Sequence, residues 1–333
     1  MSIPTHLAGI FAALLVTAGA THAAQAEPLR IGYLTWVGNG PFFVAKEKGF
    51  FAKEGVDVEL VNMAIHEALY AGLFAGQIDV IGATVDDMLP NFDPEDPYVC
   101  VMVIDDDHGA SGVLATKDIQ SIADLEGKTV GRAERTVSQF FLNVLLSDAG
   151  LTEADIEPVE MSADDAGNAF LMQEIDAAVT WEPFLTQARQ SEHGHVLADS
   201  SAMPGLIVDC LVAKTDVFDS RPAEFKALAR AWDAALAYVE AHPDEANEIM
   251  ARSVGGWLED PAVFAETLKG VRFYDSARNR EYFGTPDRPG QIYQTAQYGI
   301  DVWSSLGALD LDLTPADVIR HDLWTEYPSD ARP

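Results

Sequence analysis

Two stretches of the same design lie about a hundred residues apart, and this repeat constrains the fold more than any other feature. Ile31 to Phe43 (IGYLTWVGNGPFF) reads as a strand, a loop and the start of a helix, and Thr129 to Phe141 (TVGRAERTVSQFF) reads the same way. Each copy would present backbone N–H groups to a ligand at the start of its helix. The repeat predicts two homologous-looking lobes.

The segments around each copy also follow one order. Strand patterns alternate with helical patterns over residues 31–83 and again over 129–180, the βαβαβ order of a parallel sheet. Long apolar strands at residues 98–104 and 204–214 would cross between the lobes. The tail is mostly helical, with several proline starts, and we expect it to pack mainly on the first lobe. We therefore predict an α/β protein whose first lobe holds residues 27–106 and 209–333 and whose second holds 107–208.

Residues 1–26 differ from the rest of the chain. An apolar run, Leu7 to Val16, is followed by small residues ending in Ala24-Gln25-Ala26, which predicts a cleavable secretory signal peptide and a periplasmic location. The whole chain of 333 residues has a formal charge of −32, which argues against nucleic acid or an anionic membrane as a partner.

Both cysteines, Cys100 and Cys210, lie in apolar, strand-like runs. A disulfide stays open in an oxidising compartment, but each position suits a buried core side chain, and we favour free thiols.

Ligands of parallel α/β sheets bind beyond the carboxyl ends of the strands, so the loops there are the candidate site. Their side chains suit a compact polar, even zwitterionic, ligand between aromatic walls. Each also has a structural interpretation, as lobe-edge packing, a helix cap or a surface ion pair. The candidates are Trp36, Asn39, Thr84, Asp86, Asp87, Arg132, Glu134, Arg135, Thr136, Ser138, Trp181 and Glu182.

The run Asp105-Asp106-Asp107-His108 is the most metal-like cluster, but it lacks the spacing of a calcium loop. A hinge or ligand-contact role is favoured, and Asp106 joins the candidate ligand contacts. The chain contains no GxSxG, HExxH, GxxxxGK or CxxC motif. We expect no metal, no cofactor and no catalysis.

Five segments in order resemble the periplasmic substrate-binding proteins of nitrate/sulfonate/taurine-type ABC transporters. They are the segment from Ile31 to Val61, AGLFAGQIDVIGAT, DLEGKTVG, DAAVTWEPF and PGLIVDCLVAK. The resemblance implies a type II periplasmic binding fold, with two lobes joined by two crossing strands. The ligand-facing positions that it implies are Trp36, Gly38, Asp87, Val137, Ser138, Trp181, Glu182 and Asp209.

The resemblance also implies a partner permease with its ATPase, and we expect a monomer. Acids of the cleft would hold a cationic or donor end of the ligand, and Thr136 to Ser138, aided by Arg135, an anionic end. Taurine or another small sulfonate is the leading expectation. Guanidine-like, urea-like or pyrimidine nitrogen compounds are the alternative, and an enzyme similar to the thiamine-pyrimidine synthases is a third.

Overall fold

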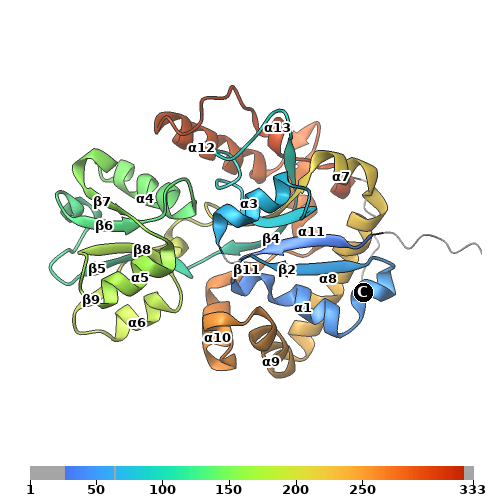
Figure 1. Cartoon of the computed structure of the whole chain (residues 1–333), viewed down its shortest axis with the longest axis horizontal. Coiled ribbons are helices and arrows are strands. Elements are labelled where there is room, and N and C mark those ends of the chain that lie inside the picture. Colours follow the sequence, from blue (N-terminus) through green and yellow to red (C-terminus); the bar gives the residue numbers. More distant parts are fainter. Residues whose placement is uncertain (1–26, 64, 326–333) are drawn as a thin grey trace, which may run out of the picture.

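The computed structural model describes residues 27–63 and 65–325 and contains two separate large sheets (Figure 1). The predicted signal peptide lies outside the described residues. The first sheet has the order β11-β4-β10-β3-β1-β2 and the second β7-β6-β8-β5-β9. The strands are β1 Leu29–Tyr33, β2 Val58–Asn62, β3 Val80–Thr84, β4 Tyr98–Asp107, β5 Ser111–Thr116, β6 Thr129–Arg132, β7 Glu157–Glu160, β8 Ala177–Trp181, β9 Gly194–Asp199, β10 Val208–Lys214 and β11 Val271–Phe273.

Both sheets share one topology, which confirms the prediction of two similar α/β lobes. In the first lobe β1 lies between β2 and β3, parallel to both, and β10 runs antiparallel beside β3. In the second lobe β6 lies between β7 and β8, again parallel to both, and β5 runs antiparallel beside β8. The predicted βαβαβ units are present, but the antiparallel strands make each sheet mixed.

In each lobe an aspartate makes the same hydrogen bond between the first and third parallel strands. The Asp79 carboxylate accepts a hydrogen bond from the backbone N–H of Arg30 at 2.9 Å, and Asp176 does the same for Thr129 at 2.9 Å. Each aspartate lies just before the third parallel strand and each donor at the start of the first. These equivalent contacts hold the two strands in the same register in both lobes.

Helices cover both sheets. In the first lobe these are α1 Gly40–Glu47, α2 Phe50–Glu54 and α3 His66–Phe74, and in the second α4 Val137–Asp148, α5 Ala163–Leu171 and α6 Phe184–Gln190. Helix α4 begins at Val137, because Thr136 caps it by accepting a hydrogen bond from the Ser138 N–H.

The C-terminal helices pack on the first lobe, as predicted (Figure 1). Trp232 of α8 contacts Phe42 of α1, with ring centroids 4.5 Å apart. Helix α12 also contacts the second lobe, where the ring centroids of its Trp303 and of Phe140 in α4 are 6.2 Å apart. No described helix has the length and apolar character needed to cross a membrane. The tail comprises α7 Thr215–Ser220, α8 Pro222–Ala241, α9 Pro243–Val254, α10 Pro261–Thr267, α11 Ser276–Phe283, α12 Gln291–Ser305, α13 Pro315–Val318 and α14 Asp322–Thr325.

Two connections join the lobes. Residues 108–110 lead from β4 to β5, and residues 200–207 lead from β9 back to β10. Strands β4 and β10 are antiparallel neighbours in the first sheet, so the outgoing and returning chains leave it side by side. This arrangement confirms the predicted pair of crossing strands.

Cys100 and Cys210 form a disulfide, which corrects our preference for free thiols. The two residues lie on the neighbouring strands β4 and β10 with their Cα atoms 5.9 Å apart. Both are fully buried, as the apolar runs predicted. The sequence could not show that these runs are adjacent in the sheet.

We predict that this disulfide contributes about 2–4 kcal/mol to the free energy of unfolding, since it closes a loop of 110 residues. Thermal unfolding measured with and without dithiothreitol should show a lower Tm in the reduced protein. The double variant Cys100→Ala, Cys210→Ala should unfold at a lower Tm and show no further response to reductant. An equal Tm in both conditions would contradict the prediction.

Candidate functional site

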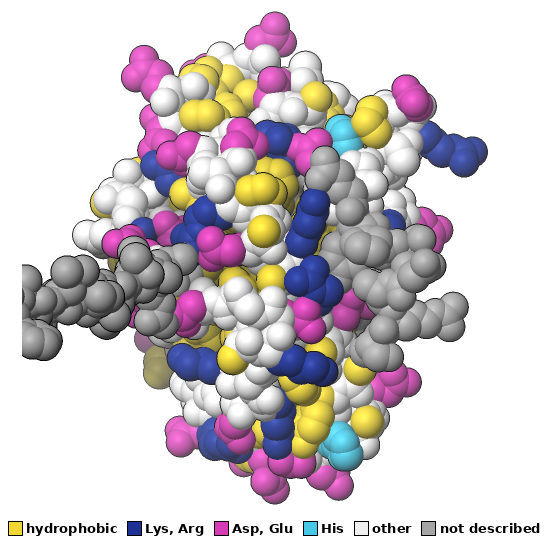
Figure 2. Space-filling view, turned by 90° about the vertical axis from the view of Figure 1, so that its right-hand side faces the viewer, with side chains coloured by type: hydrophobic (Ala, Val, Ile, Leu, Met, Phe, Trp, Pro, Cys, Tyr) yellow, Lys and Arg dark blue, Asp and Glu magenta, His cyan; other side chains and the backbone are white. Residues whose placement is uncertain are grey.

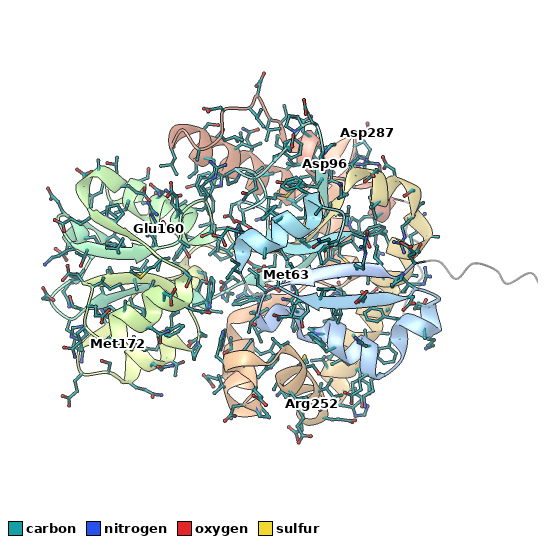
Figure 3. All side chains as sticks on the ribbon, in the orientation of Figure 1. Met63, Asp96, Glu160, Met172, Arg252 and Asp287 are labelled. Carbon is teal, nitrogen blue, oxygen red and sulfur yellow. A yellow bond between two sulfur atoms is a disulfide. The ribbon has the colours of Figure 1, made fainter. Side chains whose placement is uncertain are left out.

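A cavity of about 350 Å³ lies at the junction of the two lobes. Figure 3 labels one lining residue from each lobe, Met63 after β2 and Glu160 at the end of β7. The lining segments follow the carboxyl ends of β1, β2 and β3 in the first lobe and of β6, β7 and β8 in the second. The position agrees with the strand-end rule for α/β sheets.

Most of the side chains that the sequence nominated come together in this cavity. They arrive from five different segments and from both lobes. Those that line it are Trp36, Asn39, Thr84, Asp87, Glu134, Thr136, Val137, Ser138, Trp181 and Asp209.

Asp106 does not line the cavity. Its carboxylate accepts a hydrogen bond from the Gly205 N–H at 3.0 Å, whereas Asp107 lines the cavity. Successive side chains of a strand point to opposite faces, so only one of these two neighbours can face the ligand. The three aspartates of the acidic run lie within β4. The sequence analysis chose Asp106, whereas its neighbour Asp107 is the residue that lines the cavity.

Glu182 turns into the second lobe instead of the cavity. Its carboxylate accepts hydrogen bonds from the Thr186 N–H at 2.9 Å and from Arg189 Nη1 at 2.8 Å. It is 6% exposed and serves the first turn of α6. Only its neighbour Trp181 reaches the cavity.

Both nominated arginines are held elsewhere. Arg135 donates to the carbonyl oxygen of Pro90 in the other lobe. Arg132 is 7% exposed and pairs with Glu153, Nε to Oε1 at 3.1 Å, and with Glu160. Neither lines the cavity, so neither supplies the anion-binding charge expected from the sequence.

Gly38 and Asp86 do not line the cavity but lie next to residues that do. A Cβ atom on Gly38 would lie 1.7 Å from Asp105 Oδ2, so this glycine makes room for the hydrogen bond from Trp36 Nε1 to Asp105 Oδ2, 3.3 Å long. Asp86 is 1% exposed, and its burial, together with the nearby charge of Asp87, raises its pKa well above the usual range.

A row of polar side chains crosses the first sheet beneath the cavity. In the strand register Asp209 of β10 stands opposite Thr84 of β3 on one side and Asp105 of β4 on the other. The Asp105 and Asp209 carboxyl groups interact across the strands. Burial raises the pKa of Asp209 to about 7, and burial and the charge of Asp209 raise that of Asp105 well above its usual range.

Asp107 connects the cavity to both interlobe connections. Its Oδ1 accepts hydrogen bonds from the Ala110 N–H at 2.9 Å and the Ser111 N–H at 3.2 Å, and from the Ser200 hydroxyl at 2.6 Å. Its Oδ2 is buried and has no hydrogen-bond partner. Burial raises the pKa of this carboxyl group despite the hydrogen bonds to Oδ1.

Asp87 has a partner that the sequence did not nominate. His66 at the start of α3 contacts both carboxylate oxygens at 2.7 and 2.8 Å, and the Tyr70 hydroxyl donates to Oδ2 at 3.2 Å. Burial alone would lower the pKa of His66, but the charge and hydrogen bond of Asp87 outweigh it, and the pKa is raised. The imidazolium form is therefore favoured beside Asp87.

The second lobe has already satisfied several of its donors. Glu160 Oε1 accepts a hydrogen bond from the Glu134 N–H at 3.0 Å, and Asp164 accepts one from Trp181 Nε1 at 2.9 Å. At α4 the Thr136 hydroxyl occupies the Ser138 N–H. These three donors are thus bonded to the protein's own oxygens.

Besides Asp107, the sequence analysis missed polar and apolar residues at the ends of two strands. Asn62 ends β2, and Met63 and His66 follow it; Glu160 ends β7, and Ser162 and Asp164 follow it. Both strands are terminal in their sheets, yet their carboxyl ends point to the same edge as those of the central strands. Applying the strand-end rule to all three parallel strands of each lobe would have found them.

The cavity lining is strongly acidic. Seven carboxyl groups line it, and no Lys or Arg does so among the residues that the structure describes. On the surface the two signs mix, and Figure 2 shows Lys and Arg interspersed with Asp and Glu over the end of the first lobe. The described side chains include no cluster of three or more His, Cys, Asp or Glu that could hold a metal ion. The acidic groups are Glu67, Asp87, Asp107, Glu134, Glu160, Asp164 and Asp209.

A family model described as NMT1/THI5 like matches residues 37–246, and the chain belongs to this family. A protein of Brucella abortus described as a binding protein is 25% identical over 302 residues, covering 90% of this chain and 92% of the relative. An aliphatic sulfonates-binding protein of Bacillus subtilis is 24% identical over 246 residues, covering 71% and 74%.

Solved structures show the same fold. The periplasmic aliphatic sulphonate binding protein SsuA of Escherichia coli has a TM-score of 0.70 at 19% identity, covering 91% of this chain and 100% of that one. The periplasmic nitrate-binding protein NrtA of Synechocystis has a TM-score of 0.67 at 18% identity, covering 90% and 88%. The chain therefore has the two-lobe fold of type II periplasmic binding proteins, as the sequence resemblance implied.

We predict that the ligand-free protein loses stability as pH rises from about 5 to 8. The pKa values of Asp105, Asp107 and Asp209 are higher in the folded state than in the unfolded chain, so the folded state holds protons that it loses as pH rises through these values. Thermal unfolding should give a Tm several degrees lower at pH 8.

The variant Asp209→Asn is the matched test of this pH dependence. An amide is neutral at every pH, so the variant should have a higher Tm than the native protein at pH 8 and a smaller change in Tm between pH 5 and 8. A variant with the native pH dependence would contradict the assignment to this carboxyl pair. Asp287→Asn, an exposed site labelled in Figure 3, is the control.

Proposed function

We propose that this protein is the periplasmic solute-binding component of an ABC importer for a small polar organic ligand. The observation that carries this proposal is one cavity lined by both lobes at the point where two chain connections join them. A ligand that contacts both lobes favours the closed arrangement, because it makes more contacts there than in the open one. The permease, with its ATPase, would bind the closed arrangement. The names of the relatives support the same class.

We further propose that the moving units are residues 27–106 with 209–333 and residues 107–208. The boundaries lie one residue from the two connections, inside β4 and β10, and within the connections Gly109 and Gly205 have positive φ angles of 111° and 77°. Asp107 lines the cavity and bonds to both connections through Oδ1, while its Oδ2 has no hydrogen-bond partner. A ligand contact at Asp107 would therefore act directly on the joint between the lobes.

Two ligand classes fit the cavity on different grounds. The relatives named for sulfonates and nitrate support a sulfonate, and taurine would place its ammonium group near Asp87, Asp107 or Asp209. The acidic lining supports a nitrogen compound of the guanidine, urea or pyrimidine type. The proposed importer function holds for either class.

Catalysis is the second candidate function, because one similar protein is named for thiamine biosynthesis and another as a desulfurization enzyme. A thiamine biosynthesis protein of Haemophilus influenzae is 27% identical over 210 residues, covering 61% of this chain and 65% of the relative. The desulfurization enzyme DSZB has a TM-score of 0.60 at 13% identity, covering 89% of this chain and 97% of that one. A fold shared by binding proteins and enzymes does not decide between them.

The test of the importer function screens taurine, alkanesulfonates, guanidines, ureas and pyrimidines by thermal shift, followed by calorimetry. A ligand at a hundred times its Kd stabilises the folded state by about 2.7 kcal/mol, so Tm should rise clearly. Small-angle scattering should show a smaller radius of gyration in the complex. Mass spectrometry should recover the ligand unchanged, whereas a chemically altered ligand would favour the enzyme.

Ser200→Ala tests whether the hydrogen bonds between Asp107 and the two interlobe connections affect ligand binding. Ser200 is buried outside the cavity lining, where its hydroxyl bonds to Asp107 Oδ1 and accepts from the Gly109 N–H at 2.7 Å. Each lost hydrogen bond costs about 1 kcal/mol, so ligand affinity should fall several-fold without any lost ligand contact. Ser201→Ala is the control, since this exposed hydroxyl bonds to Asp199. Equal affinity in both variants would contradict the link.

A further inference from the structure

We infer that the ligand of this cavity is an organic cation, an ammonium, amidinium or guanidinium compound without an anionic group, and that Asp107 and Asp209 provide its counter-charge. This inference rests on the proposed binding function and narrows its ligand class. It departs from the sulfonate that the sequence favoured, and the residues of the cavity carry it.

The first sheet offers two polar atoms without partners. Asp107 is 1% exposed, and its Oδ2 has no hydrogen-bond partner although the residue lines the cavity. Thr84 is 8% exposed and lines the same wall, and its Oγ1 is also without a partner. Buried polar atoms normally find partners, and a ligand that donates to Asp107 Oδ2 and pairs with the Thr84 hydroxyl would satisfy both atoms.

Asp209 lies beside them and is partly exposed, within the cavity that it lines. Thr84 and Asp209 are directly opposite each other in the strand register, and Asp107 is two positions along β4 from Asp105, which pairs with Asp209. All three side chains therefore rise from one face of the sheet. A flat group with several N–H donors suits this spacing of acceptors.

The second lobe disfavours an anion. Its two arginines near the cavity are bonded to Glu153, Glu160 and Pro90, and the Glu134 N–H is occupied by Glu160. Glu134, Glu160 and Asp164 are exposed at the rim, on the side that the sequence had assigned to an anionic end. A sulfonate entering here would meet carboxylates of its own sign without a Lys or Arg among the described lining residues.

The aromatic residues of the cavity also suit a cation. Trp36 and Trp181 line it from opposite lobes, and each indole N–H is held by a carboxylate, Asp105 for Trp36 and Asp164 for Trp181. With the N–H groups fixed, the rings contribute their faces and edges to the wall. Indole faces attract desolvated cations, and lobe closure would remove water from the site.

The test compares probes matched in shape but not in charge, guanidinium with urea, benzamidinium with benzamide, and choline with 3,3-dimethylbutanol, with taurine and isethionate as sulfonates. Thermal shift and calorimetry on the full mature chain should find at least ten-fold tighter binding of the charged member of a pair. Isethionate should not bind. A neutral or anionic probe that binds as well as its cationic partner overturns the inference, and so does a set in which no cation stabilises the protein.

Asp107→Asn and Asp209→Asn remove one charge each with little change in shape. The amide introduced by Asp107→Asn keeps an oxygen for Ala110, Ser111 and Ser200 and replaces only the oxygen that has no hydrogen-bond partner. Each variant should lose at least ten-fold in affinity for the tightest cation, while Asp287→Asn should bind like the native protein. Because Asp209→Asn should be the more stable protein at pH 8, weaker binding there is not a folding defect.

The two proposals fail in different ways. An anion that binds and reduces the radius of gyration would overturn the cation inference and leave the importer function standing. A cation that binds tightly without closing the lobes, or that is released chemically altered, would overturn the importer function and leave the charge preference standing. Unchanged affinity in both aspartate variants would overturn the inference even if a cation binds.

Discussion

The structure depends on carboxyl groups, two buried and one partly exposed, where the two lobes meet. Asp105, Asp107 and Asp209 lie on one face of the first sheet, on neighbouring strands, and the described cavity lining contains no Lys or Arg. Desolvation and mutual repulsion make this arrangement costly when all three are ionised, so the folded protein holds protons there. A cation would relieve the same cost, which couples ligand binding to the charge state of the site.

The same residues position the joint between the lobes. Asp107 lines the cavity and stabilises both connections through one oxygen, and Asp106 bonds to the Gly205 N–H on the returning connection. The disulfide between β4 and β10 holds together the two strands from which these connections start. The disulfide therefore ties these two strands together on the first-lobe side of both connections.

Much of the site was predictable because of where parallel strands end. Thr84 and Trp181 end strands whose pattern is plain in the sequence, Trp36 and Thr136 lie in loops after such strands, and all four line the cavity. The choice of Asp106 instead of Asp107 failed because a one-residue change of register reverses which face a side chain points to. Glu182 failed for another reason, since a neighbouring arginine on α6 competes for it within its own lobe.

The sequence alone determined the two lobes, their common order of elements, the two crossing strands and the loops of the site, because these follow from local patterns of apolar residues, turns and helix starts. Only the tertiary structure decided that Cys100 and Cys210 pair, that His66 accompanies Asp87, and that the arginines of the second lobe turn away from the cavity. These features depend on contacts between segments far apart in the chain. The charge of a binding site is such a feature, because it is set by which side chains remain unpaired after all the others have found partners.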